Sequence, residues 1–482
     1  MIEGLRPYPE MKDSGVPWLG EVPAHWQVRP LKSMLVARVN GSWGDDPDVS
    51  GVVAKCIRAT DFDHVRLMAK VSAAPKRSYA AADFERRRLS RGDLVMATSG
   101  GTQDVAVGAV VVFDSDEKAA PTNFAMKLVT HASVVPRFLA YLMSAANRNG
   151  VTRALTDQVT IANLDTGRFL ASQALLPPIV EQALIVRFLD DADRRIQRYI
   201  RAKQKLIKLL EEQKQAIIHR AVTRGLEPNV GLKPSGVEWL GDVPEHWGVV
   251  RLGSLLRERG ETNEHGEMTY VLSLLRDRGV IPYDEKGNIG NKKSEDITRY
   301  KVVRPGDIVV NCMNVIIGSV GLSRYTGCLS PVYYVLVRRS ARDDPNYLDA
   351  VFQCRRFHQS LIRIGNGILA HRMRIPMELL KCELLPHPPA EEQMQIVRAI
   401  REWTRSCDDA IARASQEISL FREYRNRLIA DVVTGKLDVR EAAARLPDES
   451  DEPDVVDEVG EGLDAVEVSE GELDDVLEGV EA

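Results

Sequence analysis

The sequence lacks the patterns that mark a membrane protein, a disulfide scaffold or a zinc module. No run of about 18 apolar residues occurs in the 482 residues, and the N-terminus has no charged-then-apolar signal segment. The six cysteines are scattered, and none of them forms a CxxC pair. This spacing fits a reducing compartment. We therefore expect a cytoplasmic protein with single buried thiols and no contact with a membrane.

Basic residues are missing from the C-terminal end of the chain. After Arg445 there is no Lys or Arg, whereas residues 448–481 hold 16 acidic residues. The net charge of −5 therefore hides a basic body, with 64 basic and 53 acidic residues outside this stretch. A basic body is compatible with a polyanionic partner. We expect the acidic tail, residues 441–482, to be disordered, either as a solubilising extension or as a DNA mimic that competes for the basic surface.

Catalytic motifs are also absent. There is no GxxxxGK[ST] loop and no Asn/Asp-Pro-Pro-aromatic segment of the kind that amino-methyltransferases use. Residues 116–118 and 284–286 both read Asp-Glu-Lys, but neither has a Pro-Asp partner at the spacing of a nuclease motif. Both segments are interpreted as charged turns. We expect no catalytic residue, no metal site and no cofactor in this chain.

The most informative pattern that is present is a long internal repeat. Residues 11–35 and 232–256 share 15 of 25 positions, around the pattern SGVxWLGxVPxHW. A second repeat joins residues 177–187 to 388–398, with seven of eleven positions identical. An offset above 200 residues indicates a duplicated domain rather than a solenoid. The central parts of the two halves match only in fragments. This favours two domains that share one scaffold but carry different recognition surfaces, which we call reading heads.

Each repeat contains the sequence Pro-x-His-Trp. It places His25 next to Trp26, and His246 next to Trp247. A repeated His-Trp pair is more typical of a packing anchor at the entry of a domain than of a catalytic base.

Each half is predicted to be an α+β block followed by a long helix. Short β-rich runs, such as residues 105–113, accompany one helix with proline at its start, at 136–147 and 345–362. Apolar residues then recur with 4-3-4-3 spacing over 185–217 and 396–428. Two such stripes predict an antiparallel coiled coil of roughly 60 Å with pseudo-two-fold symmetry. The positions assigned to the coiled coil and to subunit docking are Leu189, Ile196, Tyr199, Leu206, Leu210, Ile217, Ile400, Trp403, Phe421, Tyr424 and Leu428.

The repeated SGVxWLGxVPxHW segments, the PPxxEQxxIV helix starts and the closing LIADVVTGKL of residues 428–437 resemble one known family. They are similar to the specificity subunit of type I restriction–modification systems, up to about residue 440. The resemblance implies two target recognition domains, each reading one half of a split DNA sequence. It also implies helical regions that space these domains and dock two methyltransferase subunits. S-adenosylmethionine, ATP and Mg²⁺ would then belong to the methyltransferase and the motor/nuclease subunits, and this chain would be non-catalytic.

The predicted domain boundaries follow from the repeats. They are an N-terminal arm at 1–22, a first recognition domain at 23–176, a central helical spacer at 177–226, a second recognition domain at 227–385, a C-terminal helical spacer at 386–440 and the acidic tail at 441–482.

Specific binding of double-stranded DNA needs cations for the phosphates and polar side chains for the base edges. The candidates in loops and short basic clusters are Lys76, Arg77, Arg86, Arg87, Arg88, Thr102, Gln103, Arg153, Gln158, Lys292, Lys293, Arg299, Lys301, Asn366, His371, Arg372 and Arg374. Residues 365–374 form the strongest candidate segment, because two glycines allow a close backbone approach beside Asn, His and two Arg. The comparable glycine-bearing stretch of the family borders DNA, which adds weight to Gln158 and Asn366.

Two other functions compete with this interpretation. One is a stand-alone DNA methyltransferase or nuclease, which would need a catalytic motif that the sequence lacks. The other is an assembly scaffold whose two domains bind protein. Divergent middles between matching ends favour reading heads, because a symmetric protein partner would require two similar faces.

Overall fold

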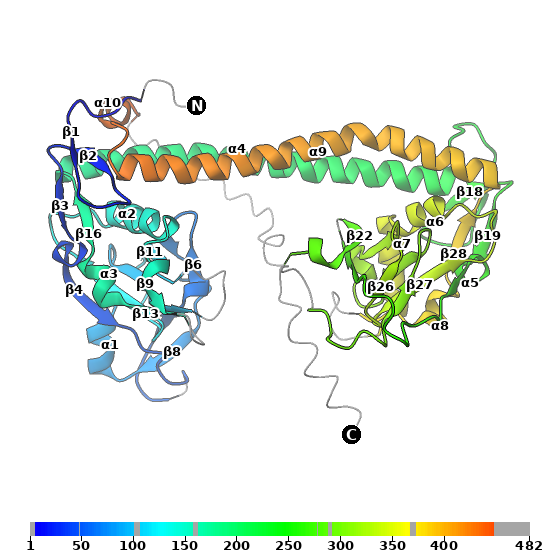
Figure 1. Cartoon of the computed structure of the whole chain (residues 1–482), viewed down its shortest axis with the longest axis horizontal. Coiled ribbons are helices and arrows are strands. Elements are labelled where there is room, and N and C mark those ends of the chain that lie inside the picture. Colours follow the sequence, from blue (N-terminus) through cyan, green and yellow to red (C-terminus); the bar gives the residue numbers. More distant parts are fainter. Residues whose placement is uncertain are drawn as a thin grey trace. The chain divides into compact units, whose positions relative to one another are not determined.

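A computed structural model describes residues 5–47, 49–100, 107–157, 162–276, 278–287, 292–366 and 373–447 (Figure 1). The chain divides into two compact units. Unit 1 holds residues 1–202 and 416–452, and unit 2 holds residues 203–415. Each unit combines sheets with helices, so the predicted α+β class is confirmed.

Unit 1 is built around a six-stranded sheet with the strand order β4-β13-β9-β11-β7-β6. Alternate side chains of a strand point to opposite faces. Leu94 and Met96 of β9 accordingly join the core beneath helix α2. Val95 and Ala97 join a second core on the other face. The elements are β4 (Leu35–Asn40), β6 (Phe62–Asp63), β7 (Met68–Ala69), β9 (Leu94–Ala97), β11 (Val110–Val112), β13 (Ala125–Thr130) and α2 (Pro136–Arg148).

Smaller sheets surround this layer. A three-stranded sheet, β12-β5-β8, contains the parallel pair of β12 and β5. The remaining elements of this part of unit 1 are β1 (Met11–Asp13), β2 (Glu21–Pro23), β3 (Gln27–Pro30), β5 (Val52–Ile57), β8 (Lys76–Tyr79), α1 (Ala81–Arg87), β10 (Ser99–Gly100), β12 (Ala119–Pro121), β14 (Thr156–Asp157), β15 (Ala162–Leu164), α3 (Thr166–Ala171) and β16 (Gln173–Leu176), with short 3₁₀ turns at Leu31–Met34, Ala59–Asp61 and Arg153–Leu155.

Unit 2 repeats the central part of this design. Its main sheet has the order β20-β27-β24-β25, in which β20, β27, β24 and β25 correspond to β4, β13, β9 and β11. Helix α6 covers it as α2 covers the sheet of unit 1. The strands are β17 (Leu232–Pro234), β18 (Asp242–Pro244), β19 (Gly248–Arg251), β20 (Leu256–Glu258), β21 (Leu272–Leu275), β22 (Gly279–Pro282), β23 (Lys301–Val303), β24 (Ile308–Asn311), β25 (Val320–Leu322), β26 (Gly327–Leu329), β27 (Tyr333–Arg338) and β28 (Leu384–His387). The helices are α5 (Leu252–Leu255), α6 (Pro345–Phe352), α7 (Arg355–Ser360) and α8 (Met377–Leu380), with 3₁₀ turns at Tyr283–Glu285, Val315–Ile317 and Leu361–Ile364.

The helix predicted at 345–362 is wrong as a single element, because α6 and α7 are separated by an extended Cys354. Phe352 and Phe357 are both fully buried in one core, with ring centroids 5.4 Å apart. In a straight helix, two side chains five residues apart differ in direction by about 140°. The bend lets both rings enter the same core.

In unit 1 the helix predicted at 136–147 is confirmed as α2. The β-rich run predicted at 105–113 forms a strand at Val110–Val112, and residues 105 and 106 lie outside the described chain.

The two long helices predicted from the apolar stripes are confirmed as α4 (Ile179–Arg224) and α9 (Ala390–Val433). Within unit 1 the start of α4 packs against the end of α9, since Ile185 and Leu189 share a core with Leu428 and Val432. Within unit 2 the end of α4 packs against the start of α9, and Lys214 pairs with Asp408 at 2.6 Å. The packing is antiparallel in each unit.

The buried stripe differs in phase from the predicted one. Leu189, Ile196, Ile400 and Leu428 are buried, and Leu210, Ile217, Phe421 and Tyr424 are half-buried. Tyr199, Leu206 and Trp403 are only partly covered, with 50%, 40% and 45% of their surface exposed. The Tyr199 ring still packs against that of Phe421 on α9, with the ring centroids 4.8 Å apart. Ile200 and Thr404, one residue later, are buried instead. The prediction followed the largest apolar side chains, whereas the helical phase decides which side chains face the partner.

Both long helices end at a glycine in the left-handed region, Gly225 with φ +70° and Gly435 with φ +75°. A Cβ on Gly435 would lie 2.3 Å from Pro23 and 3.1 Å from the ring of Trp26. A Cβ on Gly225 would lie 3.1 Å from the ring of Trp247. Each helix end is therefore fitted against the Pro-x-His-Trp segment of its own unit.

The ordered chain continues past residue 441, where we expected the acidic tail to begin. Helix α10 (Arg440–Ala444) buries Ala443 in the core of unit 1. Arg187 of α4 donates to the carbonyl oxygens of Leu446 and Pro447, at 2.6 and 2.9 Å. The rest of the predicted tail lies outside the described residues.

Candidate nucleic-acid interface

The residues that recur in the two halves build a framework at the start of each long helix. In unit 1 the buried Glu181 carboxylate accepts hydrogen bonds from the Tyr8 hydroxyl at 2.5 Å and from Trp26 Nε1 at 3.1 Å. His25 Nε2 lies 2.9 Å from its second oxygen. In the described chain, His25 is thus part of a packing network, which agrees with the interpretation of the His-Trp pair as a domain-entry anchor.

The corresponding carboxylate of unit 2 is less fully bonded. His246 Nε2 lies 2.8 Å from Glu392 Oε2, as in unit 1. Trp247 Nε1, however, is buried and has no hydrogen-bond partner among the described residues. Position 229, which corresponds to Tyr8 at the repeat offset of 221, is an Asn. The Glu392 side chain is 22% exposed, compared with 6% for Glu181.

The glutamine next to each of these carboxylates ties the long helix to the globular part of its unit. Gln182 accepts from the backbone N–H of Val135, the residue before α2, at 2.8 Å. Gln393 accepts from the backbone N–H of Asp344, the residue before α6, at 2.8 Å. Both side-chain amides also donate to the backbone of the proline pair. The repeated sequence thus positions the sheet-covering helix of each unit.

A hairpin that differs between the halves follows this helix in unit 1. Strand β14 pairs with β15, and Asp157 lies opposite Asn163. Strand β10 pairs with the other side of β15, and Ser99 Oγ lies 2.5 Å from Asn163 Oδ1. Arg153 is exposed in the turn that leads into the hairpin. Polar side chains from three segments therefore meet at one corner of unit 1.

Unit 2 has a hairpin at the corresponding place. Asn366 and Arg374 form two backbone hydrogen bonds of 2.9 Å across it, and both side chains are exposed. The returning strand is fixed at Ile375, whose N–H donates to Cys312 O at 2.9 Å and whose carbonyl accepts from the Tyr334 hydroxyl at 3.1 Å. Burial raises the pKa of the Tyr334 hydroxyl further above neutral pH. The base of the hairpin is thereby hydrogen-bonded to Cys312, directly after β24, and to Tyr334 of β27.

Two groups of predicted DNA-binding residues in unit 1 lie on β8 and α1. Lys76 and Arg88 are exposed. Arg77 forms an ion pair with Asp46 and lies over the Trp43 ring at 4.3 Å. Arg86 and Arg87 both pair with Asp83 on the preceding turn of α1. The charges of Arg77, Arg86 and Arg87 are therefore partly balanced by carboxylates of the same unit.

The predicted cations of unit 2 fall into an exposed and an engaged group. Lys292, Lys293 and Arg299 are exposed in the segment between the 3₁₀ turn at Tyr283–Glu285 and β23. The Lys293 N–H donates to the Tyr283 hydroxyl at 2.9 Å. Lys301 instead donates to Glu258 at 3.0 Å and to the Tyr333 carbonyl at 2.8 Å. Its side chain is a weaker candidate for a DNA contact than the sequence suggested.

Five predicted residues lie outside the described residues, namely Thr102, Gln103, Gln158, His371 and Arg372. In the sequence they follow β10, β14 and Asn366. All of the predicted DNA contacts stay predictions, and the hairpin residues Asn366 and Arg374 are the pair that the structure brings together.

Sequence reasoning missed one apolar feature of each corner. Phe124 directly precedes β13 and is 46% exposed, and Val332 directly precedes β27 and is 44% exposed. No periodic signal marks a single apolar residue before a strand, so composition and spacing do not reveal it.

Among the described residues, no group of three or more His, Cys, Asp or Glu side chains is arranged to hold a metal ion. The acidic turns behave as surface turns. Arg91 pairs with Asp116 at 2.7 Å and lowers the pKa of its carboxyl, and Arg278 pairs with Glu285 at 3.4 Å. The six cysteines are free, and all except Cys382 are buried.

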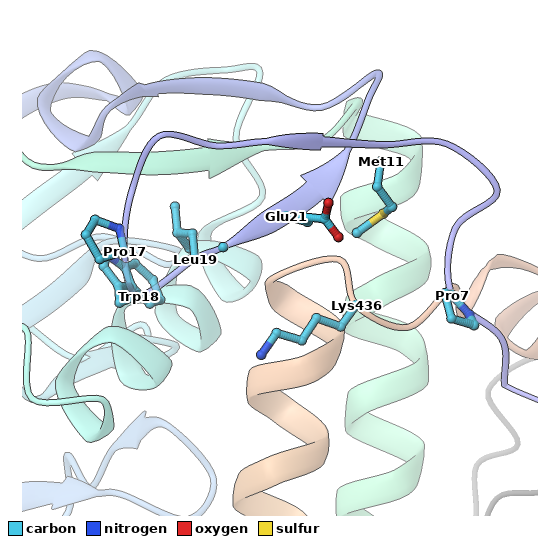
Figure 2. A pocket seen from close by; sticks show the side chains of 8 residues that line it. Pro7, Met11, Pro17, Trp18, Leu19, Glu21 and Lys436 are labelled. Carbon is cyan, nitrogen blue, oxygen red and sulfur yellow. The ribbon is translucent and has the colours of Figure 1, made fainter.

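A cavity of about 420 Å³ opens in unit 1 beside the repeated SGVxWLG segment. Figure 2 shows Pro17, Trp18 and Leu19 in one loop, with Lys436 extending from the turn after α9. None of the predicted DNA-binding residues lines it. It belongs to the framework and not to the variable corner.

No described helix is long and apolar enough to cross a membrane. No protein-family model matches the chain. A sequence comparison aligns 430 residues, at 20% identity, with the putative type I restriction enzyme MjaX specificity subunit of Methanocaldococcus jannaschii. The alignment covers 88% of this chain and 96% of that protein.

One solved chain comes from work on the complex assembly and conformational transition of the type I restriction–modification system. It matches with a TM-score of 0.58 and 15% identity, over 86% of this chain and 98% of that chain. The HsdS subunit of Thermoanaerobacter tengcongensis is less similar, with a TM-score of 0.40 and 15% identity over 86% of this chain and 96% of that chain. The fold of the first and the sequence of the archaeal relative agree with the repeated motifs. The resemblance of the chain to the specificity subunits of type I restriction–modification systems is therefore confirmed over most of its length.

Proposed function

We propose that the chain is the specificity subunit of a type I restriction–modification complex and reads a bipartite DNA target. Each unit would read one half-site through the corner that carries its hairpin. The helices α4 and α9 would space the two recognition domains and dock methyltransferase subunits. The cytoplasmic location and the domain boundaries predicted from the sequence are part of this proposal.

One observation carries the proposal. The framework residues recur in both units and make equivalent contacts, as Gln182 and Gln393 do with the helix that follows each sheet. The hairpins occupy equivalent places but present different polar groups, Asn163 with Ser99 in one unit and Asn366 with Arg374 in the other. An invariant frame with a variable polar corner is what two recognition domains with different half-sites require.

The absence of chemistry from this chain is also part of the proposal. We assign S-adenosylmethionine to two methyltransferase subunits, and ATP and Mg²⁺ to motor and nuclease subunits. A sequence without catalytic motifs supports this division of labour, because the chain would only have to bind and position.

Exposed apolar side chains on the long helices support the docking role. In unit 1 these include Val180 and Leu420, which are 71% and 57% exposed. In unit 2 they are Leu209, Met394 and Trp403, which are 54%, 56% and 45% exposed. Protein interfaces are enriched in aromatic residues and Met, and Trp403 is the best candidate for an anchor.

Replacing Arg374 with Ala tests the DNA-binding part of the proposal. We expect binding of the assembled complex to weaken by about 5- to 150-fold at the half-site that unit 2 reads, since one good base or phosphate contact contributes about 1–3 kcal/mol. Affinity is measured at several salt concentrations, because loss of a phosphate contact lowers the salt slope whereas loss of a base contact relaxes the sequence preference. The matched control is Arg251→Ala, at an exposed arginine that ends β19.

An unchanged affinity, salt slope and sequence preference for Arg374→Ala would mean that this hairpin is not the reader. Equal losses for Arg374→Ala and Arg251→Ala would assign the effect to general electrostatics.

A further inference from the structure

Each unit exposes one apolar side chain at the same place in its sheet. Phe124 stands immediately before β13, and Val332 immediately before β27. These strands occupy equivalent positions in the two main sheets, between β4 and β9 in unit 1 and between β20 and β24 in unit 2. A single exposed apolar residue needs no explanation in itself. An exposed apolar residue that recurs at equivalent positions does need one, because the sequences of the two halves diverge in this part.

The backbone at both positions is fixed beside the hairpin. The Phe124 carbonyl accepts from the N–H groups of Thr98 and Ser99, at 2.9 and 3.3 Å. The carbonyl of Thr98 in turn accepts from Leu164 of the returning hairpin strand at 2.9 Å. Phe124 is therefore hydrogen-bonded through its backbone to Ser99, the residue whose side chain pairs with Asn163.

Unit 2 repeats this connection with different residues. The Val332 carbonyl accepts from Cys312 Sγ at 3.2 Å, and the Cys312 carbonyl accepts from Ile375 of the returning strand at 2.9 Å. Val332 is thus placed next to the strand that begins with the exposed Arg374. In both units an exposed apolar side chain on a hydrogen-bonded backbone adjoins hydrogen-bonding groups at the variable corner.

This combination matches the chemistry of the major groove. Three of the four bases present only hydrogen-bonding groups there, whereas thymine also presents its C5-methyl group. A hydrogen-bonding side chain does not sense whether the methyl group is present. An apolar side chain that packs against the methyl group does. A protein-docking patch would require several neighbouring exposed apolar residues, whereas a contact with one methyl group requires a single apolar side chain.

We propose that Phe124 and Val332 read thymine, each by contact with the C5-methyl group of one thymine in the half-site of its own unit. This inference rests on the proposed function of the two units as readers of DNA half-sites. It assigns an apolar contribution to specificity that the polar hairpins do not supply.

The test uses the assembled complex and target duplexes in which one thymine at a time is replaced by deoxyuridine, which lacks the methyl group. For the wild-type chain, we expect one such replacement in each half-site to weaken binding roughly fourfold, the effect of removing one methyl group from an apolar contact. Phe124→Ala should bind the thymine duplex with a similar loss and should no longer respond to that replacement. Its response to deoxyuridine in the other half-site should stay intact, and Val332→Ala should show the reverse pattern.

Several results would overturn the inference. The first is a target whose half-sites contain no thymine. The second is a wild-type chain whose binding is unchanged by every deoxyuridine replacement. The third is a Phe124→Ala chain whose binding is weakened by deoxyuridine as much as that of the wild type. A loss of methyltransferase binding by Phe124→Ala would identify the side chain as a protein contact instead. If Phe124→Ala does not fold, Phe124→Leu retains apolar bulk and should show a reduced response at the same thymine. Failure of the proposed function itself is distinguishable, because the wild-type complex would then show no sequence preference at all.

Discussion

At the scale of single residues, the two equivalent carboxylates have unequal surroundings. Glu181 accepts hydrogen bonds from Tyr8 and Trp26 and lies against His25. Of these three contacts, Glu392 repeats the one with histidine, His246. A hydrogen bond to a buried charged group stabilises a protein by about 1.5–3 kcal/mol. Unit 1 should therefore depend on its framework carboxylate more strongly than unit 2.

We expect Glu181→Gln to lower the free energy of unfolding of unit 1 by about 2–3 kcal/mol and Glu392→Gln to lower that of unit 2 by less than about 1 kcal/mol. Hydrogen exchange of the amides in each unit measures the two effects separately. The paired substitutions are chemically identical, so each serves as the control for the other. Equal losses would show that the extra bonds of Glu181 contribute nothing to stability.

Asp349 is a second residue whose environment has a measurable consequence. It lies on α6 of unit 2, and its Oδ1 is buried without a hydrogen-bond partner among the described residues. Burial raises the pKa of its carboxyl to about 6. The corresponding residue of α2, four positions after the first proline, is the buried Ala140.

Because the pKa of Asp349 is higher in the folded state, its charge destabilises unit 2 above pH 6, and this cost is relieved as the pH falls from about 6 to 4. Asp349→Asn should thus stabilise unit 2 by about 1–3 kcal/mol at pH 8 and give no gain near pH 4. Denaturant unfolding of variant and wild type across this range measures the difference. His358, whose pKa burial lowers to about 4, affects both proteins equally and cancels. A gain that is independent of pH would contradict the assignment.

At the scale of elements, α4 and α9 explain how much of the fold the sequence predicts. Their existence, ends and antiparallel packing follow from the apolar spacing, the proline pairs and the glycines. The exact phase did not follow, since Thr404 is buried while Trp403 is 45% exposed. A pattern of apolar letters does not distinguish a helix face that meets its neighbour from one that is left for a further partner.

The same limit applies to the candidate site. Asn366 and Arg374 were predicted from their residue types and from the nearby glycines, and the structure places them across one hairpin. The ion pairs of Arg77 and Arg87 and the exposure of Phe124 depend on contacts between distant segments. Such contacts are set by tertiary packing and leave no local signal in the sequence.

The exposed face of α9 gives a prediction for assembly. Trp403→Asp should weaken association with the methyltransferase subunit at least tenfold, because truncation of an interface anchor costs 2 kcal/mol or more as an order of magnitude. Helix content should be unchanged, since the side chain lies outside the buried stripe. Arg405→Ala, at an exposed position on the same helix, is the control.

Size-exclusion chromatography and calorimetry with the purified methyltransferase measure this association. Unimpaired assembly of Trp403→Asp would remove this surface from the docking proposal. Leu189 and Ile196 are less informative positions for this test, because both are buried and their replacement with Asp would unfold unit 1.

At the scale of the whole molecule, duplication with divergence is the central feature. The two units share the order of four central strands, the helix that covers them and the framework carboxylate and glutamine. They differ in the hairpins, in the loops beside β9 and β24, and in the apolar residue before β13 and β27. The shared parts build each unit, and we infer that the differing parts read DNA.

The most direct test of this account is a map of methylated adenines in the genome of a cell that expresses the chain together with its methyltransferase. The account predicts methylation at one bipartite sequence, its loss when the chain is absent, and an altered preference in only one half of that sequence for Arg374→Ala. A methylation pattern that is the same with and without this chain, or a target that is not divided into two halves, would contradict it.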